Sequence, residues 1–178
     1  MTEPASTHPE HNLGAFLAHA VVLEDEAAER YDELADAMDN HNNAEVAALF
    51  RKMAGYSRLH RAEAVDHARQ HAGGLPPLKS WEFHWPDDES PESANLTLSH
   101  YLMTPHQALE LALQAECSAR DFYAGVAERS ELPAIVELAR EFAEEEGEHA
   151  EALEVWLKRF PKSQDDWDHD PDPPAAVD

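Results

Sequence analysis

A carboxylate and an imidazole stand three positions apart in the last third of the chain, as Glu146 and His149. On a helix this spacing places both side chains next to each other on one face. Ser57 and His60 repeat the spacing earlier, with a hydroxyl in place of the carboxylate. Neighbouring carboxylates and imidazoles are ligands for divalent metal ions. Because acidic helices contain such pairs by chance, Glu146 and His149 indicate a metal site only if other donors join them.

Two further glutamates share a second spacing. Glu24 precedes Tyr31 by seven residues, and Glu116 precedes Tyr123 by the same interval. Seven residues are two helical turns, and the flanking positions on the same face carry alanine, leucine and valine. Both carboxylates are therefore predicted to point into a core. Burying unpaired charges is costly, so a divalent metal bound between the carboxylates would stabilise the arrangement.

Proline positions indicate the elements that hold these residues, because proline disrupts a helix interior but is tolerated in the first turn. Together with capping residues they predict helices over 12–39, 43–71, 105–129 and 133–160. The second and third helices are separated by a proline-containing connection over 73–103. The order short, long and short connection is typical of an all-α, ferritin-like four-helix bundle. The equivalent spacings in both halves also suggest an internal duplication of one helical hairpin.

Several polar residues interrupt the apolar faces of these four predicted helices. Their inward positions make them candidates for a metal site. The predicted metal ligands are Glu24, His60, Glu116, Glu146 and His149. Tyr31, Tyr123 and Ser57 are predicted to surround the ligands, and the two tyrosines also suit the role of core aromatics with a bonded hydroxyl. No catalytic residue separate from the metal site is predicted. Mixed carboxylate and imidazole donors suit iron or manganese, with zinc as an alternative.

This constellation resembles the rubrerythrin branch of the ferritin-like, diiron carboxylate superfamily. The resemblance implies a pair of iron ions in the bundle core. Glu24 and His60 would then serve one ion, and Glu116 and His149 the other. Glu146 would bridge the two ions.

The resemblance covers residues 12–160 and has two departures. Ser57 stands where the family has a second bridging glutamate, and Ser118 or Ala119 stands where rubrerythrins carry a further glutamate. These losses leave open a single ion, an asymmetric pair or a water in place of the missing carboxylate. The rubredoxin domain of full-length rubrerythrins is also absent from this sequence, so a redox cycle would need an external electron donor.

Three functions remain open at this level. The first is a rubrerythrin-like iron protein that reacts with peroxide or dioxygen, with a role in oxidative stress or iron homeostasis and an oxidoreductase activity of the peroxidase or ferroxidase kind. The second is oxidation or buffering of ferrous iron without peroxide turnover. The third is a degenerate ferritin-like scaffold without catalysis, of which Ser57 would be the first sign.

The amino-acid composition argues against several other classes of protein. The chain has 37 acidic and 13 basic residues and a net charge of −24, which argues against nucleic acid or an anionic membrane as a partner. Its single cysteine, Cys117, excludes a disulfide framework and is predicted to be buried or half-buried. Residues 1–11 are predicted to be a flexible N-terminus without a secretory signal, which favours the cytoplasm, and residues 161–178 form an acidic, proline-rich tail.

Aromatic and imidazole residues outside the predicted site receive other roles. Trp81 and Trp85 are predicted to attach the 73–103 connection to the bundle, and their exposure there would favour a homodimer. His67 lies one heptad beyond His60 and is the best candidate for an extra ligand or gate. Surface or loop positions are predicted for six histidines without a paired spacing that would require a metal role, and they are His19, His67, His71, His84, His100 and His106. The other glutamates of the last helix are assigned to a solvated face, and they are Glu137, Glu141, Glu144, Glu145, Glu148, Glu151 and Glu154.

Overall fold

The computed structural model describes residues 6–86, 90–91 and 103–162. The described chain contains α1 (Leu13–Asn40), α2 (Ala44–His71), the short 3₁₀ helix η1 (Ser80–Glu82), α3 (Pro105–Arg129) and α4 (Pro133–Arg159). Each long helix begins and ends within one residue of its predicted bounds. The predicted all-α, ferritin-like bundle is confirmed. The acidic tail beyond residue 162 and His100 lie outside the described residues.

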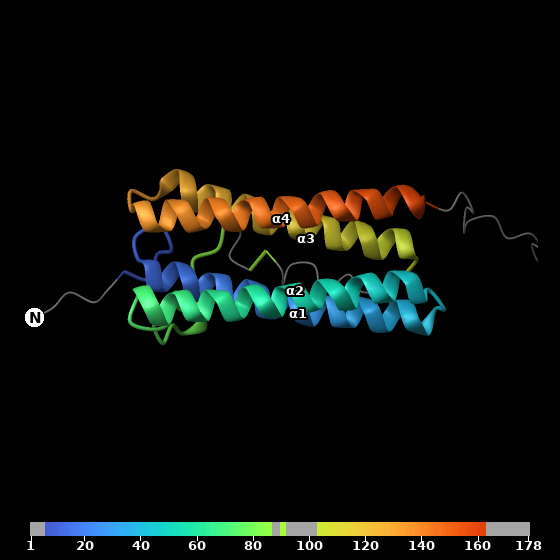
Figure 1. Ribbon diagram of the computed structural model, residues 1–178, viewed down its shortest axis with the longest axis horizontal. Coiled ribbons are helices and arrows are strands. Elements are labelled where there is room, and N and C mark those ends of the chain that lie inside the picture. The colour runs from blue at the N-terminus through green and yellow to red at the C-terminus, as the bar shows by residue number, and fades with distance from the viewer. Residues whose placement is uncertain (1–5, 87–89, 92–102, 163–178) are drawn as a thin grey trace, which may run out of the picture.

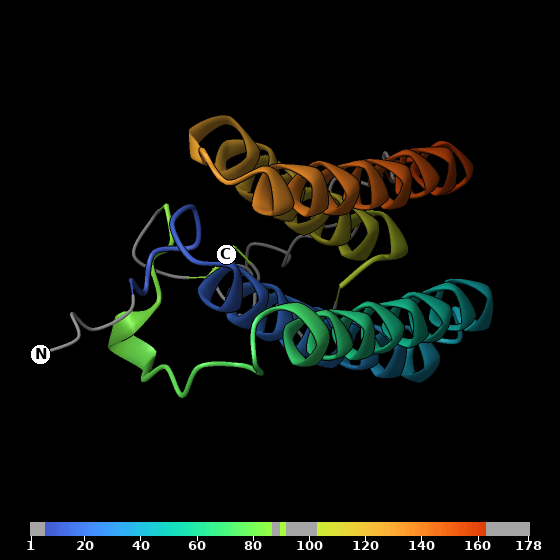
Figure 2. The same ribbon diagram turned by 60° about the vertical axis from the view of Figure 1, so that its left-hand side comes forward.

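The four long helices form two hairpins that lie against each other (Figures 1 and 2). In the first hairpin α1 packs against α2, and in the second α3 packs against α4. α2 ends at one end of the bundle and α3 begins at the other end (Figure 1). The connection between them therefore joins opposite ends of the bundle, as the ferritin-like topology requires.

Local sequence explains where the helices begin and where the first hairpin turns. The Asn12 side chain accepts a hydrogen bond from the backbone N–H of Ala15 at 3.0 Å, which caps α1. Thr104 and Gln107 form a reciprocal capping box at the start of α3. Between α1 and α2, Asn42 adopts a φ of 59°, a left-handed conformation that asparagine tolerates better than most residues.

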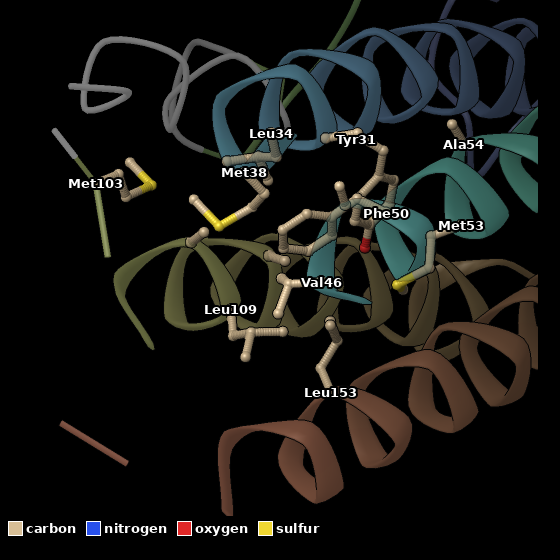
Figure 3. Packing of buried hydrophobic residues seen from close by; sticks show 14 residues of the cluster. Tyr31, Leu34, Met38, Val46, Phe50, Met53, Ala54, Met103, Leu109 and Leu153 are labelled. Atoms are coloured by element: carbon tan, nitrogen blue, oxygen red, sulfur yellow. The ribbon is translucent and has the colours of Figure 1, made fainter. Parts of the chain in front are cut away.

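Two apolar clusters fill the bundle, one towards each end. The cluster near the α1–α2 turn draws Met38, Phe50, Leu109 and Leu153 from all four helices, and their side chains converge between the helices in Figure 3. The cluster at the opposite end has Phe16 as one of its buried members. The predicted ligands fall in the sequence between the residues of these two clusters on every helix. The polar centre is therefore held in the middle of the bundle by apolar packing on both sides.

The connection between α2 and α3, called the crossover below, buries a histidine that the sequence predicted to be at the surface. His19 on α1 is 0% exposed and packs against the rings of Phe83 and Trp85. Its Nε2 accepts the backbone N–H of His84 at 2.9 Å, so its Nδ1 carries the proton that it donates to the Ala15 carbonyl at 2.7 Å. The surface prediction for His19 is wrong because the crossover, rather than another long helix, covers this face of α1.

The structure also changes the predictions for the two crossover tryptophans and for the N-terminal segment. Trp85 attaches the crossover to the bundle as predicted, but Trp81 is 74% exposed and does not. Within the predicted flexible N-terminus, Thr7 Oγ1 lies 3.0 Å from His84 Nε2 and the ring of His8 stacks on that of His84. Residues 6–11 thus contact the crossover. In the part of the chain that is described, no helix is both long enough and apolar enough to cross a membrane.

Candidate metal centre

Three of the predicted ligands converge in the middle of the bundle. Glu116 from α3 and Glu146 from α4 are buried, and His149 is half-buried one turn after Glu146. His149 Nδ1 lies 3.3 Å from Glu116 Oε2 and 3.2 Å from Glu146 Oε2. One donor atom from each residue lies within 4.8 Å of the other two. This is the ligand spacing that a single divalent ion requires.

The other two predicted ligands form a second, looser half of the centre. His60 Nδ1 lies 3.7 Å from Glu24 Oε1, and Glu24 is buried. The His60 ring stacks on the His149 ring with centroids 5.5 Å apart, so the two halves are neighbours. His60 Nδ1 is itself buried and has no hydrogen-bond partner among the described residues. An unsatisfied imidazole nitrogen beside a carboxylate is a donor arrangement that a cation would complete.

The paired carboxylates of the tighter half titrate in opposite directions. Burial raises the pKa of Glu146, and the negative charge of Glu116 raises it further. Burial alone would raise the pKa of Glu116 as well, but hydrogen bonds with His149 and Glu146 and the charge of Arg30 outweigh it and lower that pKa. Without a bound cation, a proton taken up by the pair therefore resides on Glu146 rather than on Glu116. Metal binding would have to displace that proton.

The two tyrosines occupy equivalent positions but make different contacts. The Tyr31 hydroxyl donates a hydrogen bond to Glu116 Oε1, which joins α1 to α3. The Tyr123 hydroxyl is buried and has no hydrogen-bond partner among the described residues. Burial raises the pKa of both phenols, followed by the charge of Glu116 for Tyr31 and of Glu24 for Tyr123. Both phenols are therefore neutral donors, and only the Tyr31 donor is used.

Arg30 belongs to the centre although the sequence pattern did not single it out. Its side chain is buried, and one guanidinium nitrogen lies 3.7 Å from Glu116 Oε1. The charge of Arg30 offsets that of Glu116 in the metal-free protein. Ala27 and Leu34, three and four residues away, are buried on the same helix. That position at the edge of an apolar face is the one sequence signal that could have identified Arg30.

Glu145 brings an additional carboxylate to the half that lacks a bridging glutamate. Ser57 is buried one turn before His60, where its short side chain cannot replace a carboxylate. Glu145 on the opposite helix α4 is half-buried, and its Oε2 lies 4.0 Å from His60 Nε2. The assignment of Glu145 to a solvated face is therefore wrong. At 4.0 Å the two atoms are too far apart for a hydrogen bond, so Glu145 adds negative charge beside the His60 imidazole without fixing its orientation.

The donor set fits a divalent metal ion. Glu116, Glu146 and His149 supply converging donors, and His60 presents an unused Nδ1 towards Glu24. Carboxylates with imidazoles suit iron, manganese and zinc. The described structure does not add His67 to the converging group.

We expect Tyr31→Phe to weaken metal binding about 10- to 100-fold, the usual cost of removing a hydrogen bond to a ligating carboxylate. The measurement is a titration with Mn²⁺ or Zn²⁺ followed by calorimetry. Tyr56→Phe is the matched control, because the Tyr56 side chain is exposed and the substitution keeps the ring that contacts His149 and Lys52. Equal affinities for wild type and Tyr31→Phe would show that the Tyr31 hydroxyl does not support a ligand.

Comparisons with known proteins agree with this geometry. A family model described as Rubrerythrin matches residues 15–81 and again residues 107–173. Each match begins in the first helix of a hairpin, as expected for an internal duplication. The crystal structure of an uncharacterised conserved protein from Magnetospirillum magnetotacticum is 42% identical, with a TM-score of 0.69, and the alignment covers 84% of this chain and 95% of that one. The comparison with curated proteins gives no match.

The family match extends over both hairpins and spans more than half of the chain. It includes Glu24 and His60 in the first hairpin and Glu116, Glu146 and His149 in the second. On this evidence the chain belongs to the rubrerythrin family.

Proposed function

We propose that this protein binds one or two iron ions in the bundle core and uses them to reduce peroxide or dioxygen. The observation that carries the proposal is the convergence of Glu116, Glu146 and His149 in a buried centre, with donor atoms within 4.8 Å of one another. Family membership supports iron as the metal. An external electron donor would return the iron to the ferrous state after each cycle.

Ferrous iron at this site would supply one electron from each of two ions to hydrogen peroxide, whose O–O bond breaks with uptake of two protons to give two waters and two ferric ions. The chain's own residues hold the geometry for this reaction. His149 Nδ1 faces both carboxylates, and the Tyr31 hydroxyl fixes Glu116 from the opposite hairpin. The unused hydroxyl of Tyr123 is a buried neutral donor that suits a polar oxidant.

The two halves of the metal centre are expected to bind iron ions with unequal affinities. Glu116, Glu146 and His149 already have ligand spacing, so the first ion is expected there. Glu24 and His60 are further apart, and Ser57 adds no carboxylate. A second ion would therefore bind more weakly, with Glu145 contributing a nearby negative charge.

The test is an anaerobic reaction of the ferrous-loaded protein with hydrogen peroxide, with iron oxidation followed by absorbance. Wild type is expected to lose ferrous iron rapidly, and His60→Ala with His149→Ala is expected to react no faster than free ferrous iron. His11→Ala with His41→Ala is the matched control, because it removes two imidazoles that contribute no donor to the centre. Equal rates for wild type and the His60/His149 variant would refute the proposal.

Ferrous-iron oxidation or buffering is the second candidate, and the net charge of −24 favours it by raising the local cation concentration. Stoichiometry separates the two functions, because binding of many irons per chain indicates storage and one or two indicate a redox centre. Protein that binds no transition metal, and whose melting temperature no added metal raises, would instead favour the scaffold function. The homodimer also remains a proposal, supported by the exposed Trp81.

A further inference from the structure

A cleft of about 510 Å³ lies between the C-terminal part of α2 and the N-terminal part of α4. These two segments lie at the same end of the bundle (Figure 1). His67 and His71 line the cleft from α2, and Glu137 and Glu141 line it from α4. None of these four residues belongs to the converging group of Glu116, Glu146 and His149.

The four side chains form two pairs with the same spacing along their helices, although their donor atoms do not converge as those of Glu116, Glu146 and His149 do. His67 and His71 are four residues apart on one helix, and their ring centroids are 5.9 Å apart. Two histidines at this spacing on one helical face are a recognised way to bind zinc. Glu137 and Glu141 have the same spacing on the facing helix. Each helix thus supplies a pair of donors one turn apart, and the two pairs share one cleft.

The walls of the cleft distinguish it from a solvated group of charges. Leu13, Leu17 and Leu138 also line it, and Leu17 is fully buried while the other two are half-buried. His67 is half-buried beside these apolar residues, whereas His71, Glu137 and Glu141 are exposed at the mouth of the cleft. Apolar walls lower the local dielectric constant and strengthen the attraction between carboxylates and a cation. Two imidazoles and two carboxylates in such surroundings favour a borderline ion such as Zn²⁺ or Fe²⁺ over Mg²⁺ or Ca²⁺.

We propose that His67, His71, Glu137 and Glu141 form a second divalent-metal site, outside the bundle centre. Binding would require these side chains, of which His71, Glu137 and Glu141 are exposed, to rotate until imidazole nitrogens and carboxylate oxygens meet on one ion. His67 is seven residues from His60, so the ion lies about 10 Å from the centre along the axis of α2. On α4, Glu145 follows Glu141 by one turn and approaches His60. The outer site therefore lies on the same α2–α4 seam as the centre and holds a cation close to it.

The test titrates Zn²⁺ into the full chain in which the centre has been disabled by His60→Ala and His149→Ala, with calorimetry as the readout. We expect about one equivalent of Zn²⁺ to bind this variant. Adding His67→Ala and His71→Ala is expected to abolish that binding. In the imidazole region of an NMR spectrum, Zn²⁺ should shift the resonances of His67 and His71 in the centre-disabled protein.

Matched acidic variants separate chelation from general charge. Glu137→Gln with Glu141→Gln is expected to weaken Zn²⁺ binding strongly. Glu144→Gln with Glu148→Gln makes the same charge change at exposed positions of α4 that do not line the cleft, and is expected to leave binding unchanged. Circular dichroism of each variant checks that the helices are intact.

The outer site does not depend on the proposed iron chemistry. Failure of the iron proposal would leave Zn²⁺ binding by the centre-disabled protein intact. No Zn²⁺ binding by a folded centre-disabled variant would overturn the outer site, whatever the centre does. Binding that persists after the His67 and His71 substitutions, or that falls equally in the two acidic variants, would overturn it as well.

Discussion

Replacing Arg30 with methionine is expected to lower the free energy of unfolding of the metal-free protein by about 3–5 kcal/mol. Arg30 and Glu116 are both buried, and the guanidinium lies 3.7 Å from the carboxylate. Without Arg30, Glu116 either stays charged in the core or takes up a second proton beside Glu146, and both states are unfavourable. Urea unfolding at pH 7 in the presence of a chelator measures the change.

A double-mutant cycle with Glu116→Gln identifies the cause of this loss. If the charge of Glu116 is responsible, Arg30→Met will destabilise the Glu116→Gln protein much less than the wild type. A bound divalent ion supplies positive charge at the same carboxylate, so Mn²⁺ should also recover part of the lost stability of Arg30→Met. Equal losses in both backgrounds would show instead that Arg30 stabilises the fold mainly through the packing of its side chain.

Acidification should destabilise the protein through His19. Burial lowers the pKa of His19 from 6.5 to about 4, with the backbone hydrogen bond to Ala15 acting in the opposite direction. The unfolded chain takes up a proton below pH 6.5, whereas the folded chain does so only near pH 4. The contribution of neutral His19 is therefore fully present above pH 6.5 and is lost as the pH falls to 4, by about 3 kcal/mol.

His19→Gln removes this titration and isolates it from the many carboxylates. The free energy of unfolding of wild type and His19→Gln is measured in urea at intervals from pH 7 to pH 4. The advantage of wild type over the variant should shrink by about 3 kcal/mol across this range. A constant difference between wild type and His19→Gln would contradict the prediction.

The helical periodicity of apolar residues, together with the proline and capping residues at helix ends, was sufficient to predict the four helices. Thr104 with Gln107 marked the start of α3, where the predicted capping box forms, and Pro133 marked the start of α4, where no side chain caps the helix. The same periodicity placed Glu24 and Glu116 on inward faces, because the direction of a side chain about its own helix axis depends only on position in the sequence. Membership of the rubrerythrin family agrees with the motifs that these positions form.

Tertiary packing decided what those inward residues meet. Rotation and axial register between helices depend on how side chains interdigitate, which no single helix specifies. That register brings His149 close to Glu116 but leaves His60 further from Glu24, and it gives Tyr31 a partner while Tyr123 has none among the described residues.

The sequence by itself therefore determined the bundle, its duplicated hairpins and the polar residues that face its core. Only the tertiary structure decided that His19 is buried beneath the crossover and that Glu145 approaches His60 from the facing helix. It also decided that His67 lines a cleft together with Glu141 and is not part of the converging group in the centre. The physical reason is that periodicity acts within one helix, whereas burial by a long connection and contacts between facing helices depend on residues far apart in the chain.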